Sequence, residues 1–207
     1  LYGFKYPSNF NNGGIYNKVP MKCNFENTIL KSYEDYRLNR HDIKELDNGN
    51  FLVLDDFLDL GPIPLGDWTH QFQNLGYEAD GETLEINWKS TNIIELNEFG
   101  DEVWRWNFLD YFSTEEYDIY GGTWWAALQR TDYDWTHSNS IWFDKNNDVI
   151  YFSVRHLSKI LKIDYPSGDI IWQMGLPEEF NVGTNNICPE LGFSWQHDVK
   201  LLDNGNL

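Results

Sequence analysis

The strongest constraint on the fold of this chain is a segment that occurs twice. It reads HDIKELDNGN at 41–50 and HDVKLLDNGN at 197–206, and eight of the ten positions are identical. In both copies an alternating segment runs into Asp-Asn-Gly-Asn, which predicts a hairpin turn because Asn-Gly readily adopts positive φ. Self-similarity of this kind is typical of repeat architectures, in which every repeat is one supersecondary unit.

A looser third copy and a second type of hairpin lie between these two segments. The looser copy begins at His137 and reads HSNSIWFDKNNDVIYFS. The second hairpin type reads NIIELNEFGDEVWRW at 92–106 and KILKIDYPSGDIIWQM at 159–174. Each of these has an apolar strand, a polar turn that ends in Gly-Asp, and a returning strand with a Trp. The two hairpin types therefore alternate along the chain.

Two consecutive hairpins make one four-stranded antiparallel sheet, and repeated sheets of this kind are the blades of a β-propeller. The sequence thus predicts an all-β fold in which 41–207 is a partial β-propeller domain. We expect the first blade at about 41–107, the second at about 137–175, and the start of a third at His197.

The other segments of the chain carry no repeat. Segments 55–90 and 108–136 are expected to be insertions or loops that pack over a face of the propeller, and 107–117 also allows a helix. Residues 1–40 carry no recognisable motif and stay unassigned.

Two and a half blades cannot close a propeller. We therefore expect the chain to be a fragment of a longer protein, or to be completed by a partner chain. Sheet edges left open by missing blades favour association, so a homo-oligomer is a further expectation. The fragment by itself is expected to be inactive or to aggregate.

Composition excludes several classes of partner. The formal net charge is −18, and an acidic surface repels nucleic-acid phosphates and anionic membranes. No apolar run approaches the roughly 20 residues of a membrane-spanning helix. With 41% hydrophobic and 17% aromatic residues the chain is not of the disordered type. If the substrate is an anion, the positive charge that binds it must be local.

Three histidines occupy the same position in the repeat. His41, His137 and His197 each open the first strand of a repeat. If that strand is innermost, its end lines the central channel, and the three imidazoles converge there. Imidazole can act as a nucleophile, as a proton carrier or as a metal ligand at neutral pH. The alternative is a repeat residue that makes a structural hydrogen bond.

The sequence gives no specific signal for a metal or a cofactor. Cys-x-x-Cys and His-x-x-x-His spacings are missing, and the neighbouring carboxylates Asp42 and Asp198 alternate away from His41 and His197 along the strand. We therefore expect neither a metal nor a cofactor. Cys23 and Cys188 are the only cysteines, and either one disulfide or two thiols remains open.

Arg155 is the cation that best fits an anionic substrate. It ends the returning strand of the second predicted blade, in Ser153-Val154-Arg155-His156, and its fork of donors suits a tetrahedral oxyanion. Strand alternation predicts that Arg155 and His156 point to opposite faces, so that only one of them reaches a given site. The alternative is an ion pair with one of the many carboxylates.

Several of these motifs together resemble the bacterial arylsulfate sulfotransferases. The matching stretches run from His41 to Asn206 in the same order as in that family. They are His41-Asp42 with Asn48-Gly49-Asn50, then DWTHSNS at 134–140, then Val154-Arg155-His156, and finally Gln196-His197-Asp198 with Asn204-Gly205-Asn206.

The resemblance implies a six-bladed propeller whose active site lies at the central channel. It implies ping-pong transfer of a sulfuryl group from an aryl sulfate to a phenol, without 3′-phosphoadenosine phosphosulfate and through a sulfohistidine. His197 corresponds to the nucleophile, and His41, His137 and Arg155 correspond to the supporting residues. Export to the periplasm or the cell exterior is implied as well. Family members carry a close cysteine pair upstream of the nucleophile, where this chain has Cys188 alone.

Aromatic side chains near these motifs are candidates for stacking on the aryl rings. They are Trp124, Trp125, Tyr133 and Trp195. The alternative for each of them is a place in the core of the propeller.

Two other functions fit the same sequence. One is a propeller without catalytic activity that binds a ligand or a protein through its channel. The other is a quinone-dependent dehydrogenase, because its repeats resemble the Gly-Asp-x-x-Trp hairpins. Such an enzyme would need calcium and a redox cofactor, for which the sequence shows no convincing site.

Overall fold

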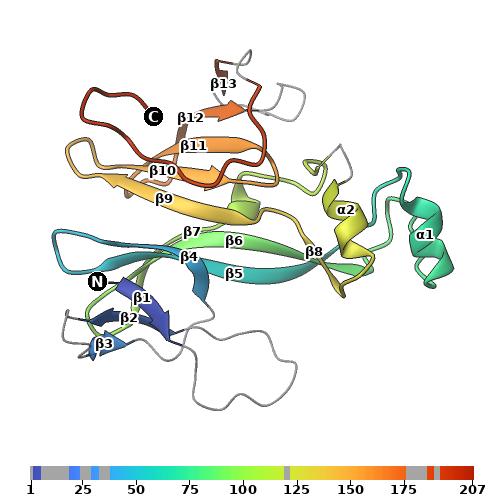
Figure 1. The fold of residues 1–207 in the computed structure, drawn as a ribbon, viewed down its shortest axis with the longest axis horizontal. Helices are drawn as coiled ribbons and strands as arrows, with labels where there is room; N and C mark the ends of the chain where they lie inside the picture. Colours follow the sequence, from blue (N-terminus) through green and yellow to red (C-terminus); the bar gives the residue numbers. More distant parts are fainter. Residues whose placement is uncertain are drawn as a thin grey trace. The chain divides into compact units, whose positions relative to one another are not determined.

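The computed structural model describes residues 38–118, 122–175, 186–188 and 192–207, together with the backbone of three N-terminal strands (Figure 1). The chain divides into two compact units. Unit 1 comprises 1–56 and 91–107, and unit 2 comprises 57–90 and 108–207.

Strands make up most of the regular structure, which confirms the all-β prediction. The helical segments are short: α1 (Thr69–Asn74), a 3-10 turn η1 (Phe108–Asp110) and α2 (Gly122–Ala127). The strands are β1 (Tyr2–Lys5), β2 (Val19–Cys23), β3 (Ile29–Ser32), β4 (Leu38–Glu45), β5 (Phe51–Gly61), β6 (Ile86–Leu96), β7 (Glu102–Trp106), β8 (Asp132–Asp134), β9 (Ser138–Asp144), β10 (Val149–Val154), β11 (Lys159–Asp164), β12 (Ile170–Gly175) and β13 (Asn186–Ile187).

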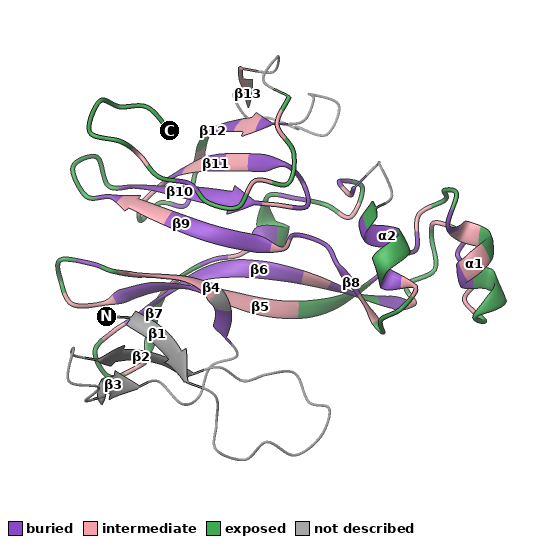
Figure 2. Ribbon diagram, in the orientation of Figure 1, coloured by how far each residue is buried: buried purple, intermediate pink, exposed green. Residues whose placement is uncertain are grey.

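The sheet that carries the predicted second blade lies in unit 2. Strands β9, β10, β11 and β12 pair antiparallel in chain order, and β13 adds to β12 in parallel (Figure 1). All six residues of β10, VIYFSV, are buried, as expected for a central strand rich in β-branched and aromatic residues (Figure 2). No sheet closes on itself within the described residues.

The repeated Asp-Asn-Gly-Asn segments form the same turn, as the sequence predicts. The N–H of Leu46 donates to the carbonyl of Asn50 at 2.8 Å, and the N–H of Leu202 donates to that of Asn206 at 2.8 Å. The turn needs a left-handed residue, which Gly supplies with φ of 83° in one copy and 84° in the other. The sequence repeat is therefore a structural repeat.

The two hairpins of the second type close their turns with a corresponding backbone hydrogen bond, although the turn at 164–169 is one residue longer than the turn at 97–101. The N–H of Asn97 donates to the carbonyl of Asp101 at 2.9 Å, and the N–H of Asp164 donates to that of Asp169 at 2.9 Å. A glycine with positive φ precedes the closing Asp in both turns.

The start of the third repeat packs on the sheet of the second. Val199 is buried against Val149 and Tyr151, and partly buried apolar side chains surround this contact. These are Trp142, Ile160, Trp172 and Leu201. Residues 195–201 are thereby held against the β9–β12 sheet, which fixes the position of the segment that contains His197.

Strands β4, β5, β6 and β7 form a second sheet in the same order as in the sequence. The boundary between the two units falls within β5 and within β6. In unit 1 its core consists of apolar side chains from these strands: Leu38, Phe51, Val53, Ile94 and Leu96, with Ile43 packed against them. Strands β1, β2 and β3 form a separate antiparallel sheet.

The predicted insertions are partly strand. Strand β5 continues to Gly61 and β6 begins at Ile86, so the connection between them is shorter than the predicted 55–90. Within 108–136 lie η1, α2 and β8, and the helix that 107–117 allows is reduced to the 3-10 turn η1. Tertiary pairing extended the strands beyond what the repeat pattern marks.

An aromatic cluster forms the core of the rest of unit 2. Trp124 stacks on Tyr133 with ring centroids 3.7 Å apart, and Trp88 contacts both Tyr133 and Trp135 edge to face. Strand β8 pairs parallel to β6 beside this cluster, with Asp134 opposite Lys89. The cluster therefore fixes β8, the strand from which the site described below is built.

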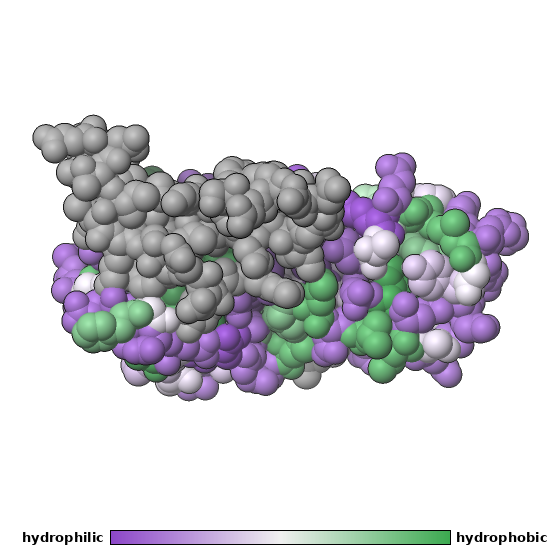
Figure 3. All heavy atoms as spheres, turned by 90° about the horizontal axis from the view of Figure 1, so that it is seen from below, coloured by the Kyte–Doolittle hydropathy of each residue, from purple (hydrophilic) through white to green (hydrophobic). Residues whose placement is uncertain are grey.

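On the face drawn in Figure 3, apolar residues form small groups among hydrophilic ones. Scattered exposed apolar side chains are normal for a folded protein. No helix among the described residues has the length and apolar character needed to cross a membrane.

Candidate functional site

Unit 2 contains a cleft of about 170 Å³. Its walls come from α2, β8, the turn after β10 and the segment before His197. The lining residues are Thr123, Ala126, Ala127, Arg130, Asp132, Asp134, His137, Arg155, His156 and Trp195. Imidazole, guanidinium and carboxylate groups thus face a common space.

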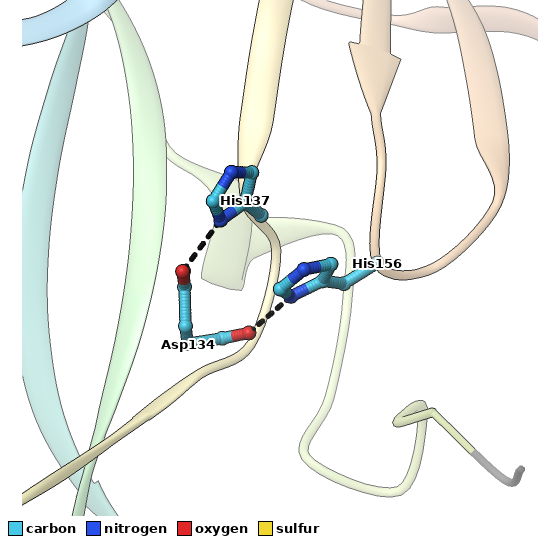
Figure 4. Close-up of side chains that lie close together, drawn as sticks. All are labelled: Asp134, His137 and His156. Carbon is cyan, nitrogen blue, oxygen red and sulfur yellow. Dashed lines mark hydrogen bonds and ion pairs between the residues drawn. The ribbon is translucent and has the colours of Figure 1, made fainter. Parts of the chain in front are cut away.

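Asp134 and His137 form a close pair at one side of this cleft (Figure 4). The Nδ1 atom of His137 lies 2.5 Å from Oδ2 of Asp134. Burial acts to raise the pKa of Asp134, but the hydrogen bond and the charge of His137, with further positive charge from Lys89, lower it to about 2. Asp134 is therefore an anion at neutral pH.

His156 contacts the same residue through a different atom. Its Nδ1 lies 2.5 Å from the backbone oxygen of Asp134, and its ring stacks on that of His137 with centroids 4.5 Å apart. Burial lowers the pKa of His156 to about 4. The imidazole of His156 is therefore neutral at pH 7, with its proton on Nδ1.

Arg155 lies beside His156 and over Trp195. Its Nη1 is 3.2 Å from Nε2 of His156, and its guanidinium carbon is 4.5 Å from the centre of the Trp195 ring. Its Nε is buried and has no hydrogen-bond partner among the described residues. The guanidinium is thus fixed on two sides by side chains that carry no negative charge.

The prediction that Arg155 and His156 point to opposite faces is wrong. Strand β10 ends at Val154, and both residues belong to the turn that follows it. Strand alternation does not extend into a turn, so both side chains line the same cleft.

The segment before His197 is anchored to the sheet by Gln196. Its Nε2 is within 2.8 Å of the Lys159 carbonyl, 3.3 Å of the Val154 carbonyl and 3.2 Å of Ser153 Oγ. Its own carbonyl accepts a hydrogen bond from Asn139 Nδ2 at 2.9 Å. Trp195, next to it, is thereby placed at the cleft.

Two cleft residues have the left-handed backbone conformation, which residues other than glycine rarely adopt. His137 has a φ of 42° and Trp195 a φ of 57°. Such residues cost about 1 kcal/mol or more and persist where the surrounding structure holds them. Here the Asp134 hydrogen bond and the Gln196 anchor do so.

The structure places the four predicted catalytic residues differently from one another. His137 and Arg155 line the cleft, whereas His197 is exposed and is not among the lining residues. His41 lies in unit 1, on β4, with its Nδ1 2.5 Å from Asn39 Oδ1. The convergence of all three imidazoles at one site therefore stays a prediction.

The four predicted aromatic residues also separate. Trp195 lines the cleft and is 39% exposed. Trp124 and Tyr133 are fully buried in the aromatic cluster behind it, which favours a supporting role over direct stacking on a substrate. Trp125 is exposed and does not line the cleft.

Sequence reasoning did not select Asp134 or His156. A signal for Asp134 was available, because it precedes His137 by three residues. Strand alternation, if it held here, would allow only one of Arg155 and His156 to reach the site, and Arg155 is the one that suits an anion. A turn after Val154 would have brought His156 in, but nothing in the residue types marks the end of that strand.

One group among the described residues has the chemistry of a metal site. The potential ligand atoms of Asp134, His137 and His156 lie within 4.8 Å of one another. The Nδ1 atoms of the two histidines are already used in hydrogen bonds. Arg155 and Arg130 lie next to the group, and Arg130 Nη1 is 3.7 Å from Asp134 Oδ2. Two guanidinium groups oppose a further cation by Coulomb repulsion.

The sequence was compared with known protein families. The profile described as Arylsulfotransferase (ASST) matches residues 73–207, more than half of the chain.

The chain belongs to the arylsulfotransferase family.

This membership confirms the resemblance noted from the motifs. Every residue that lines the cleft lies within the matched range, whereas His41 precedes it. Arylsulfotransferases act in general on aryl sulfates and phenols and are typically periplasmic. No curated protein matches the sequence.

The cysteines add no disulfide to the described part of this chain. Cys188 is a free cysteine and is partly exposed. The side chain of Cys23 lies outside the described residues.

Proposed function

We propose that this protein moves a sulfuryl group from an aryl sulfate to a phenol by a ping-pong mechanism, with His197 as the nucleophile. The observation that carries the proposal is the cleft itself, where Arg155 and His137 meet within the matched range of the family. In a chain of net charge −18, the guanidinium of Arg155 gives this cleft a local positive charge that suits an anionic substrate.

The first half-reaction would form a sulfohistidine. The neutral imidazole of His197 attacks sulfur, an N–S bond forms, and the S–O bond to the donor phenol breaks. The leaving phenolate takes a proton from an imidazolium, which becomes neutral. This proton donor is His41 or His137.

The second half-reaction would restore the enzyme. The neutral imidazole takes the proton of the acceptor phenol, whose oxygen attacks sulfur while the N–S bond breaks. The products are a new aryl sulfate and free His197. Neither step needs 3′-phosphoadenosine phosphosulfate or another cofactor.

Arg155 would stabilise the charge on the sulfuryl oxygens. Its guanidinium is held between His156 and Trp195 and forms no ion pair with a carboxylate among the described residues. A fixed cation that does not have to reorganise during reaction is the main form of electrostatic catalysis. Trp195, exposed beside it, offers a ring face to an aryl group.

We propose that the fold is a β-propeller of which this chain forms a part. Two sheets follow one another along the chain, each with four consecutive strands in sequence order and a fifth strand added in parallel. The strands that contain or follow His41 and His137 lie at sheet edges. The start of the third repeat packs on the face of the second sheet, as neighbouring blades do. In a six-bladed propeller, 41–207 would form two blades and the start of a third.

The complete propeller would bring His41, His137 and His197 to its central channel. A longer chain or a second copy would supply the missing blades, and the protein would act in the periplasm or outside the cell. Isolated residues 1–207 are then expected to lack activity.

The test is turnover of a chromogenic aryl sulfate with added phenol, using the longest form of the protein. The His197→Ala variant should lose phenol-dependent release by at least ~1,000-fold. The control is His70→Ala, because His70 is exposed on α1 outside the cleft. Near-complete turnover by His197→Ala would rule out this nucleophile. A folded full-length protein without turnover would favour a propeller that only binds its ligand.

A further inference from the structure

Asp134 holds two imidazoles through two of its own oxygens (Figure 4). Its carboxylate Oδ2 contacts His137 Nδ1 and its backbone carbonyl contacts His156 Nδ1, each at 2.5 Å. A carbonyl oxygen and an ionised carboxylate can only accept hydrogen bonds. Both Nδ1 atoms must therefore carry a proton in these bonds.

This contact decides which nitrogen of His137 can exchange a proton. Because Nδ1 keeps its proton toward Asp134, exchange takes place at Nε2, on the opposite edge of the ring. A carboxylate in this position also stabilises the imidazolium that forms when Nε2 is protonated. His137 lies at the cleft with the proton-bearing edge fixed, which suits a general acid and base.

The second contact decides the orientation of Arg155. With a proton on Nδ1, the Nε2 atom of His156 is an acceptor, and it lies 3.2 Å from Nη1 of Arg155. The backbone carbonyl of Asp134 thus orients the neutral ring of His156, and that ring in turn orients the guanidinium of Arg155. Trp195 covers the other side of both groups.

Asp134 is well placed to keep both contacts rigid. It lies on β8, which pairs with β6, and the N–H of Trp135 donates to the Lys89 carbonyl at 3.0 Å. Its side chain is mostly buried.

We propose that Asp134 is a positioning residue for sulfuryl transfer: its carboxylate orients His137 so that His137 gives and takes the phenol proton at Nε2, and its carbonyl orients His156 beneath Arg155. The inference rests on the proposed function and assigns the proton transfer to His137 in place of His41. One proton is given to the leaving phenolate and one is recovered from the acceptor, so His137 returns to its starting state.

The first test is spectroscopic and needs no activity. Long-range ¹H–¹⁵N spectra of the full chain with ¹⁵N-labelled histidine report which ring nitrogen carries the proton. We expect the Nδ1–H form for His156 at pH 7 and for His137 once it is neutral, although free histidine favours Nε2–H. An Nε2–H form at His137 in the unaltered protein overturns the inference.

Asp134→Asn sharpens this test. The variant removes the carboxylate but keeps the backbone carbonyl, so the tautomer of His137 should change while that of His156 should not. If both residues keep their Nδ1–H form, the carboxylate does not control His137. Because the unaltered protein is informative alone, a variant that fails to fold does not remove the test.

The second test is kinetic and uses aryl sulfates whose leaving phenols differ in acidity. Asp134→Asn should lose ~100-fold in kcat with weakly acidic phenols and much less with nitrophenols, which leave without a proton. The matched control is Asp132→Asn, which removes a carboxylate of the same cleft that makes no hydrogen bond to an imidazole within the described part of the chain. It should not steepen the dependence on leaving-group acidity.

The two proposals fail in different ways. Absence of turnover in the unaltered full-length protein contradicts the proposed function. The prediction of the histidine tautomers is then still tested by the spectra. Turnover that is intact, with an equally shallow leaving-group dependence in Asp134→Asn, contradicts the positioning role alone.

Discussion

The guanidinium carbon of Arg155 lies 4.5 Å from the ring centre of Trp195, two residues before His197. The proposed nucleophile and the proposed sulfuryl-binding cation are therefore connected through one stacked pair. Trp195 is fixed by its backbone, with φ of 57°, and by the neighbouring Gln196. The stack ties the third repeat to the turn after β10.

The first prediction concerns the shape of the Arg155 side chain. Arg155→Lys keeps the charge but loses the planar fork that reaches His156 and stacks on Trp195. We expect kcat to fall ~100-fold, since removal of one stabilising donor at a developing oxyanion costs about that much. Steady-state kinetics with an aryl sulfate donor measure it. A lysine variant with full activity would show that charge alone is sufficient.

The second prediction concerns the Gln196 anchor. Gln196→Ala removes the donor that reaches two backbone carbonyls and Ser153 Oγ, and leaves these acceptors in a largely buried place. We expect a loss of about 1–3 kcal/mol in the free energy of unfolding. The kcat should fall as well, because Gln196 no longer holds the neighbouring Trp195 and His197 against the sheet.

Gln129→Ala is the matched control for this variant. Gln129 is exposed after α2 and is not among the residues that line the cleft. Denaturant unfolding followed by tryptophan fluorescence compares the two. Equal stability of both variants would show that the Gln196 hydrogen bonds are not a net contribution.

The third prediction is a pH dependence of stability. The pKa of His156 is lowered to about 4 by burial, from 6.5 in the unfolded chain. Between these values the unfolded state binds more protons, so stability rises with pH. Above pH 6.5 the imidazole is neutral in both states and the free energy of unfolding is not reduced. As the pH falls from 6.5 toward 4, protonation of the unfolded state progressively lowers the free energy of unfolding. The total decrease in the free energy of unfolding is about 3 kcal/mol, because one pKa unit corresponds to about 1.4 kcal/mol.

Groups around His156 determine this effect together. Asp134, His137 and Arg155 face its ring, and Trp195 covers it. Urea unfolding at pH 7 and pH 5 should show a slope that His156→Gln reduces, whereas the exposed His70→Ala leaves it intact. Identical pH slopes for the unaltered protein and His156→Gln would contradict a neutral, buried imidazole.

The fourth prediction separates two adjacent tryptophans. Trp124 is fully buried and stacks on Tyr133, whereas Trp125 is 42% exposed. Trp124→Ala should cost about 3–5 kcal/mol in unfolding free energy, as for other large-to-small core changes, and Trp125→Ala within about 1 kcal/mol. Thermal unfolding measures both. A strong loss of substrate affinity in a stable Trp125→Ala would restore that residue to the site.

Much of the fold was accessible from the repeat. The Asp-Asn-Gly-Asn turns, the Gly-Asp turns and the β9–β12 sheet follow from short-range signals, because turn geometry depends on a few neighbouring residues. The length of β5 and β6 was not accessible, because pairing with distant strands extends a strand past its local pattern.

The sequence by itself determined the all-β class, the family and three of the cleft residues, His137, Arg155 and Trp195. Repeat positions and motifs are carried by the order of residues along the chain. The tertiary structure decided which side chains contact one another. It joined Asp134 to two imidazoles, placed His156 under Arg155, and put Trp124 and Tyr133 into the core. Such contacts depend on where β10 ends and how β8 pairs with β6, which is settled by packing between distant segments and not by any local run of residues.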